Sequence, residues 1–123
     1  MKILLWQAAI LPGKEAELEA YANTLLLQFF QQQPGCLGVS FFQHGQQFQL
    51  LSYWHHNKDA QQMLASEAHQ KLTTLLLQRY LLAAMPAEFA QIQGGFLSQK
   101  AQQQLAFCHA TETLQPLAAL CYG

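Results

Sequence analysis

His69 is the residue of this sequence whose type and position best suit acid–base chemistry. It follows the serine in Leu64-Ala65-Ser66-Glu67-Ala68-His69 by three positions. Serine is a common helix N-cap, and the positive end of a helix dipole disfavours a protonated imidazole. A neutral imidazole could act as a general base and take a proton from a bound molecule. The alternative is that His69 is a solvated helix residue with no chemical role.

His55-His56 is the most conspicuous candidate for metal binding. In a regular strand, adjacent side chains point to opposite faces, so these two rings would not reach the same ion. The sequence contains no His-x-x-x-His motif and no carboxylate cluster with ligand spacing. We therefore expect no metal site and interpret the pair as polar residues at a strand end.

Three cysteines, Cys36, Cys108 and Cys121, are widely spaced and form no Cys-x-x-Cys pair. This pattern favours reduced thiols and a cytoplasmic location over a disulfide framework. The apolar N-terminal stretch is short and lacks a signal-peptide cleavage site, and no segment approaches the length of a membrane span. Phosphate-loop, dinucleotide-binding and serine-hydrolase motifs are also absent from the sequence.

The composition is rich in apolar residues and poor in charge. Of 123 residues, 51% are hydrophobic and 11% are charged, whereas about 25% of the residues of a typical domain are charged. The net charge of −1 comes without a basic stripe, which argues against nucleic acid or an anionic membrane as partner. The length suits one domain, and the scarcity of charge favours an oligomer.

Periodicity predicts the elements that must position these residues. Alternation predicts strands over residues 2–10, 36–44 and 47–55, and helical spacing predicts helices over 14–33, 57–64 and 67–85. Asn57 and Ser66 are the expected caps of the last two helices, and Pro86 should end the last one. Residues 88–93 are favoured over 105–109 as a closing strand.

This order of elements predicts an α+β fold. Strand, helix, strand, strand, helix, strand is the split βαβ order of ferredoxin-like folds. We predict such a domain over residues 1–95, followed by a C-terminal extension over 96–123 that packs on the domain or on a dimer partner.

The predicted strands are apolar on both faces. Ile3 and Leu5 alternate with Leu4 and Trp6, yet the helices can cover only one face of the sheet. The other face would expose more apolar surface than a monomer usually tolerates. We therefore predict a homodimer in which two sheets pack face to face. The alternative is that the C-terminal extension covers this face.

Four segments resemble the antibiotic biosynthesis monooxygenase domain in order and spacing. They are Leu11-Pro12-Gly13-Lys14-Glu15, Pro34-Gly35-Cys36-Leu37-Gly38, Tyr53-Trp54-His55 and Leu64-Ala65-Ser66-Glu67-Ala68-His69. The resemblance covers residues 1–93 and implies a dimeric ferredoxin-like α/β barrel. Members of that family oxidise polycyclic aromatic or quinol-like substrates with dioxygen, many without metal or flavin, and others degrade haem.

The resemblance also suggests site residues. The haem-degrading branch carries Asn, Trp and His at positions that correspond to Trp6, Met63 and Thr73, so no haem and no other cofactor is expected here. We predict His69 as the catalytic base and a substrate pocket formed by Trp6, Phe41, Trp54, Met63 and Thr73. Trp54 could instead be a core anchor. The alternative function is a non-catalytic dimeric barrel that binds or senses a small hydrophobic metabolite.

Overall fold

The structure, a computed structural model, describes residues 1–105 and forms two compact units, Met1–Ile92 and Gln93–Gly123. The sequence-based boundary lies after residue 95. Cys108 and Cys121 lie outside the described residues, as does most of the alternative strand 105–109.

The first unit is built on a sheet whose central strand is β1 (Lys2–Ile10). One edge of β1 pairs antiparallel with β3 (Gln47–Trp54), which forms a hairpin with β2 (Cys36–His44). The other edge pairs with β4 (Leu81–Ala84) and with β5 (Glu88–Gln91). The order β2-β3-β1-β4 confirms the predicted ferredoxin-like α+β class.

The strand β4 corrects the prediction that the preceding helix extends to residue 85. The helix ends at Arg79, and β4 pairs with β1 through Ala8↔Ala84, Ala9↔Ala83 and Ile10↔Leu81. The run Leu81-Leu82-Ala83-Ala84 suits a helix by local propensity. It forms a strand because β1 otherwise has unpaired backbone groups at its buried end.

The first helical segment consists of α1 (Glu15–Tyr21), η1 (Ala22–Leu26) and α2 (Leu27–Gln31). It confirms the predicted helix, except that η1 is a π-helical turn, which periodicity did not reveal. Within it, the Thr24 hydroxyl donates a hydrogen bond to the Ala20 carbonyl oxygen at 2.8 Å. Leu26 and Phe30 are buried on its inner side.

Two further helices, α3 (Asn57–Ala65) and α4 (Glu67–Arg79), meet at Ser66. The Ser66 Oγ accepts a hydrogen bond from the His69 backbone N–H at 3.2 Å, which confirms the predicted cap. The cap predicted at Asn57 is wrong, because His56 occupies the N-cap position and Asn57 is already helical.

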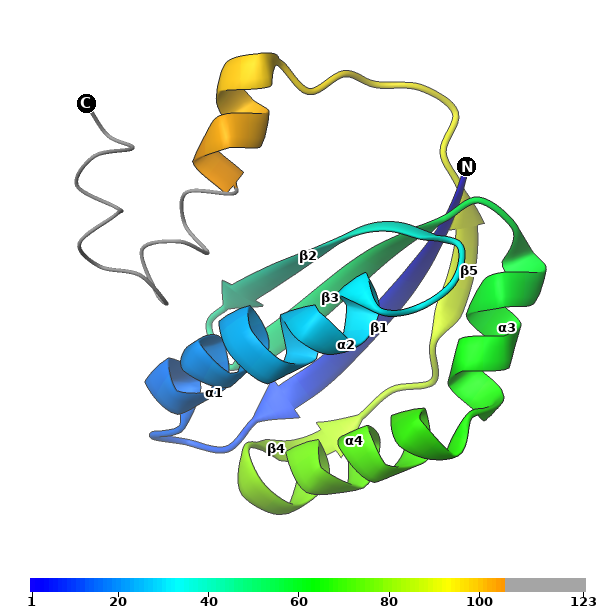
Figure 1. Cartoon of the computed structure of the whole chain (residues 1–123). Helices are drawn as coiled ribbons and strands as arrows, with labels where there is room; N and C mark the ends of the chain where they lie inside the picture. The colour runs from blue at the N-terminus through cyan, green and yellow to red at the C-terminus, as the bar shows by residue number, and fades with distance from the viewer. Residues whose placement is uncertain (106–123) are drawn as a thin grey trace. The chain divides into compact units, whose positions relative to one another are not determined.

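The helices cover one face of the sheet, and the core lies between them (Figure 1). Its largest fully buried side chain is Trp54, whose indole N–H donates a 2.7 Å hydrogen bond to the buried Ser52 hydroxyl. Inward side chains of β1 and β3 are mostly buried, whereas their neighbours on the opposite face, such as Leu5 and Leu51, are partly exposed.

The described part of the second unit contains a helical stretch over residues 99–105. The Ser98 Oγ accepts a hydrogen bond from the Ala101 N–H at 3.0 Å, as an N-cap does. Across residues 1–105, no helix is both long and apolar enough to cross a membrane.

Gly35 is expected to be the glycine that least tolerates a side chain. It has φ +79°, and an added Cβ would collide with the carboxylate of Asp59. Gly13 has φ +84° with open space around it, so alanine there should cost only the left-handed strain of about 1–2 kcal/mol. We expect Gly35→Ala to lower the free energy of unfolding by roughly 1–3 kcal/mol more than Gly13→Ala does.

Urea denaturation of both variants measures this difference. The Asp59→Gly background should remove the excess cost of Gly35→Ala, because it removes both the carboxylate and the Cβ that the added methyl group would meet. An equal cost of Gly35→Ala in both backgrounds would show that the collision is not its cause.

Candidate functional site

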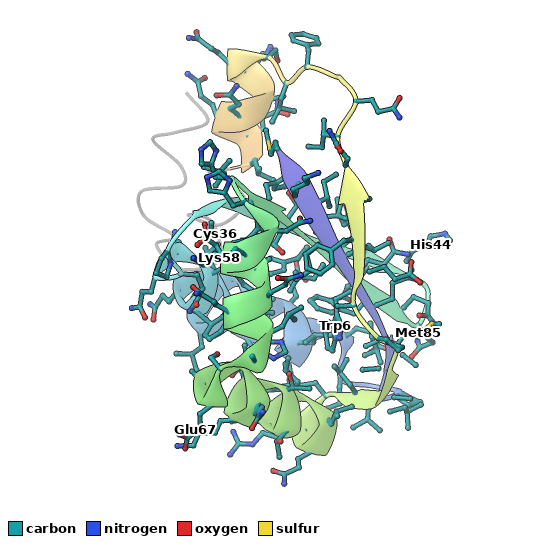
Figure 2. The ribbon with its side chains drawn as sticks, turned by 90° about the vertical axis from the view of Figure 1, so that its right-hand side faces the viewer. Trp6, Cys36, His44, Lys58, Glu67 and Met85 are labelled. Carbon is teal, nitrogen blue, oxygen red and sulfur yellow. The ribbon has the colours of Figure 1, made fainter. Side chains whose placement is uncertain are left out.

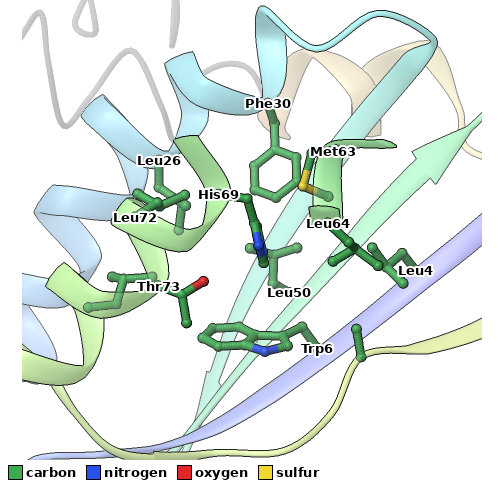
Figure 3. A pocket seen from close by; sticks show the side chains of 12 residues that line it. Leu4, Trp6, Leu26, Phe30, Leu50, Met63, Leu64, His69, Leu72 and Thr73 are labelled. Atoms are coloured by element: carbon green, nitrogen blue, oxygen red, sulfur yellow. The ribbon is translucent and has the colours of Figure 1, made fainter. Parts of the chain in front are cut away.

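A small cavity lies between the sheet and the helices (Figure 3). Its volume is about 30 Å³, enough for roughly two water molecules. It is lined by Leu4, Trp6, Leu26, Phe30, Leu50, Met63, Leu64, His69, Leu72, Thr73, Leu76 and Ala87. Apart from His69 and Thr73, these side chains are hydrocarbon, thioether or indole, so the cavity is mostly apolar, with two polar side chains on one wall and the N–H of the Trp6 indole on another.

Every layer of the first unit contributes to the lining. Strand β1 supplies Trp6, which lies between the strands and α4 in Figure 2. Helix α3 supplies Met63, and α4 supplies both polar groups, His69 and Thr73. Three of the predicted pocket residues, Trp6, Met63 and Thr73, thus lie around the predicted base.

His69 is half-buried, and its imidazole points into the cavity on the side of Trp6 (Figure 3). Its ring centroid lies 6.4 Å from that of Phe29. Burial lowers the pKa of His69 below its usual 6.5, and a backbone hydrogen bond with Leu64 partly opposes this shift. The adjacent N-terminus of α4 disfavours the imidazolium as well. The imidazole is therefore neutral at pH 7 and can accept a proton.

The helical period explains why His69 faces inward. His69, Leu72, Thr73 and Leu76 are spaced as i, i+3, i+4 and i+7 along α4, and all four line the cavity. This spacing places them on one face of a helix. His69 is therefore not the solvated helix residue of the alternative interpretation. The helical spacing of His69 with Leu72 and Leu76 already indicated in the sequence that its side chain faces inward.

Phe41 and Trp54 lie on the helix-covered face but do not line the cavity. The Phe41 ring stacks on Phe48 at 6.1 Å, and Phe48 in turn meets the edge of Trp6 at 6.4 Å. Phe48 therefore connects Phe41 to the cavity wall. Trp54 is a core anchor held by Ser52, which corresponds to the alternative interpretation of this residue.

Several lining residues were absent from the sequence-based pocket. They are Leu4, Leu26, Phe30, Leu50, Leu64, Leu72, Leu76 and Ala87. The period of two places Leu4 beside Trp6, and the helical period places Leu26 beside Phe30, so the pattern contained a signal for these. Ala87 had none, because it lies in the break between β4 and β5.

The histidine pair is arranged differently from the expectation of opposite faces. The ring centroids of His55 and His56 lie 4.2 Å apart. The expectation was wrong because β3 ends at Trp54 and His56 is already the N-cap of α3. Within residues 1–105, no three His, Cys, Asp or Glu side chains are grouped so that they could hold a metal ion.

Cys36 offers no activated nucleophile to the site. Its half-buried thiol is free, and burial raises its pKa, while a backbone hydrogen bond with Gly38 opposes that shift. The side chain does not line the cavity. A raised pKa means little thiolate at neutral pH, so Cys36 is a poor nucleophile.

The fold has many solved counterparts. A structure described as an antibiotic biosynthesis monooxygenase aligns with a TM-score of 0.60 at 18% identity, covering 76% of this chain and 100% of the other. SnoaB from Streptomyces nogalater, a cofactor-independent oxygenase, aligns with a TM-score of 0.62 at 12% identity, covering 79% and 97%. This chain has the antibiotic biosynthesis monooxygenase fold.

The fold likeness confirms, at the level of structure, the resemblance predicted from the four segments. It extends to a protein of unknown function from Nitrosomonas europaea, with a TM-score of 0.62 at 18% identity, covering 79% of this chain and 93% of the other. By sequence, the chain matches no family model and no curated protein. At these identities the comparison establishes the fold, while activity has to be argued from the cavity.

The lowered pKa of His69 predicts a pH-dependent stability. Below pH 6.5 the unfolded chain binds a proton that the folded chain resists, so the His69 contribution is complete above that pH and is lost as the pH falls through the folded pKa. We expect the free energy of unfolding to decrease less between pH 7 and pH 5 in His69→Gln than in the unmodified protein.

Urea titrations at both pH values test this expectation, with His44→Gln as the matched control because His44 is exposed. The control should retain the pH dependence of the unmodified protein. The same pH dependence in the His69→Gln variant would contradict the burial argument.

Proposed function

We propose that this protein is a cofactor-independent monooxygenase that oxidises a small aromatic or quinol-like substrate with dioxygen. The observation that carries the proposal is the neutral, half-buried His69 imidazole that points into an apolar cavity. The fold shared with SnoaB, a cofactor-independent oxygenase, supports it.

In the proposed reaction, His69 takes a proton from a phenol or from the CH2 group of an anthrone-type substrate. The conjugated carbanion passes electrons to dioxygen, and a carbon–oxygen bond forms to give a hydroperoxide. Cleavage of the oxygen–oxygen bond leaves one oxygen on the carbon as a ketone, and the other departs as water. Overall, CH2 and O2 become C=O and H2O, and the substrate supplies all the electrons.

The remaining lining suits such a substrate. Apolar walls favour an aromatic ring and exclude water, and the indole of Trp6 offers a surface for ring packing. The cavity of about 30 Å³ must widen to admit a ring. Met63 is one of the lining residues, and a methionine side chain adapts readily to a changed shape.

We also propose that the protein works as a homodimer in the cytoplasm. The sheet face opposite the helices carries Ile3, Leu5, Leu51 and Tyr53 in register across β1 and β3. Packing this face against a second copy would remove an apolar surface from water. The free thiol of Cys36 suits a reducing compartment.

A second candidate function is binding without catalysis. The observation that favours it is the lining itself, which is apolar except for His69, Thr73 and the indole N–H of Trp6. Such a cavity could hold or sense a small hydrophobic metabolite with no reaction. Turnover distinguishes the two functions.

Oxygen consumption tests the enzymatic proposal. Purified protein without added cofactor should consume oxygen with anthrones or hydroquinones, and His69→Gln should lower kcat/KM by roughly 10²–10⁴-fold, as the loss of a general base does. His44→Gln is the control and should retain full activity, because His44 lies at the far end of β2 (Figure 2).

The rate should also decrease at acidic pH as His69 becomes protonated, with an apparent pKa below 6.5. Binding without oxygen consumption across the panel would favour the second function. Unchanged turnover in His69→Gln would remove this residue from the mechanism.

The dimer predicts a solution mass of twice 13.9 kDa. Leu51 lies in the middle of the open face, paired with Leu5 on one side and Ser40 on the other, so Leu51→Lys should give monomers because it buries an unpaired charge. The control Gln61→Lys adds the same charge on the exposed surface of α3. Light scattering that finds a monomer for the unmodified protein would refute the dimer.

A further inference from the structure

Thr73 is a polar side chain of the cavity wall and follows His69 by about one helical turn. Thr73 is partly buried, lines the cavity and points its hydroxyl inward on the side of His69 (Figure 3). Many helical threonines bond back to a carbonyl of the preceding turn, as Thr24 does to Ala20. Within residues 1–105, the Thr73 hydroxyl makes no such bond, nor one to another side chain.

An unpaired hydroxyl inside an apolar cavity indicates a partner outside the protein. Buried polar groups are nearly always hydrogen-bonded, and leaving one unpaired is costly. The other hydrogen-bonding side chains around the cavity are the His69 imidazole and the Trp6 indole N–H. Within residues 1–105 the Thr73 hydroxyl bonds to neither, so its partner would enter the cavity. A water molecule can serve in the empty cavity, and a ligand oxygen can replace it.

We propose that Thr73 determines substrate specificity by binding a second oxygen of the substrate, next to the oxygen or carbon that His69 deprotonates. The preferred ligand class is an aromatic ring with two oxygen substituents on one edge, such as a 1,2-diol or a hydroxyl beside a carbonyl. This inference deepens the proposed function and rests on it for the role of His69.

The spacing of the two groups supports this choice of class. His69 and Thr73 are four residues apart in α4, so their side chains emerge on one face, about 5–6 Å apart at Cβ. Two oxygens on one ring edge can meet both groups at once. The oxygens of a 1,4-diol lie at opposite ends of the ring, so when one of them meets His69 the other cannot also meet Thr73.

The expected discrimination follows from the cost of unpaired polar groups. A site built around a ligand oxygen rejects a ligand that lacks it, because the protein hydroxyl then loses its partner. One neutral hydrogen bond changes the dissociation constant by about 2- to 13-fold. Specificity of this size is measurable as a difference between ligands of equal ring size.

Calorimetric titration without oxygen tests the inference, using 1,2-dihydroxynaphthalene, 1,4-dihydroxynaphthalene and 1-naphthol. The unmodified protein should bind the 1,2-diol about 5-fold more tightly than either other ligand. Thr73→Val has nearly the same shape and should remove this preference, while Thr73→Ser should retain it. The matched control is Thr74→Val, since Thr74 is exposed on the outer side of α4, and it should bind like the unmodified protein.

The outcomes separate this inference from the proposed reaction, because binding without oxygen requires no turnover. Equal affinity for the three ligands, a preference that survives in Thr73→Val, or no binding at all would overturn the role of Thr73. A preference for the 1,2-diol that Thr73→Val removes would establish the role. If that protein then consumes no oxygen when air is admitted, the recognition stands and the monooxygenase proposal fails.

Discussion

The pairing of both edges of β1 is the constraint on which the rest of the structure depends. One edge pairs with β3 and the other with β4 and β5, so the backbone of this central strand is paired with a strand on both sides except at Trp6 and Gln7, opposite the break between β4 and β5. That requirement converts Leu81–Ala84 from a potential helix into a strand and ends α4 at Arg79. It also places the break between β4 and β5, where Ala87 lines the cavity, opposite the part of β1 that presents Trp6. The cavity is thus a consequence of how the sheet is completed.

The chemistry of the cavity arises from one end of one helix. Ser66 caps α4 through the His69 backbone, and the same turn directs the His69 side chain inward. Burial then lowers the pKa of the imidazole and keeps it neutral, so a base is available at neutral pH. Thr73 follows one turn later on the same face. A single helix therefore supplies both polar groups, and the surrounding apolar walls strengthen their effect by excluding water.

The comparison with solved structures and the cavity contribute different parts of the functional argument. The antibiotic biosynthesis monooxygenase fold occurs in SnoaB, an oxygenase, and in a protein of unknown function at similar TM-scores. A fold shared at 12–18% identity therefore sets the arrangement of helices and sheet and leaves the reaction open. The reaction is argued from His69 and Thr73, whose placement belongs to this chain. The strands are apolar on both faces, which is one reason why the composition contains so few charged residues. The proposed pairing of two sheets would cover the face that the helices leave open.

The sequence by itself determined the features that depend on neighbouring residues. It predicted β1, the β2–β3 hairpin, the Ser66 cap and the fold class, because strand alternation, turn residues and capping are local in the chain. The helical spacing of apolar residues in α4 also indicated that the His69 side chain faces inward. Only the tertiary structure decided that residues 81–84 form a strand, that Leu26 and Phe30 reach the cavity while Phe41 and Trp54 do not, and that His55 and His56 lie together. Residues 81–84 form a strand because they pair with an open edge of β1. The lining of the cavity depends on which side chains from different elements fill the same space, and the histidine pair depends on where β3 ends. Each of these is determined by contacts between residues distant in the sequence.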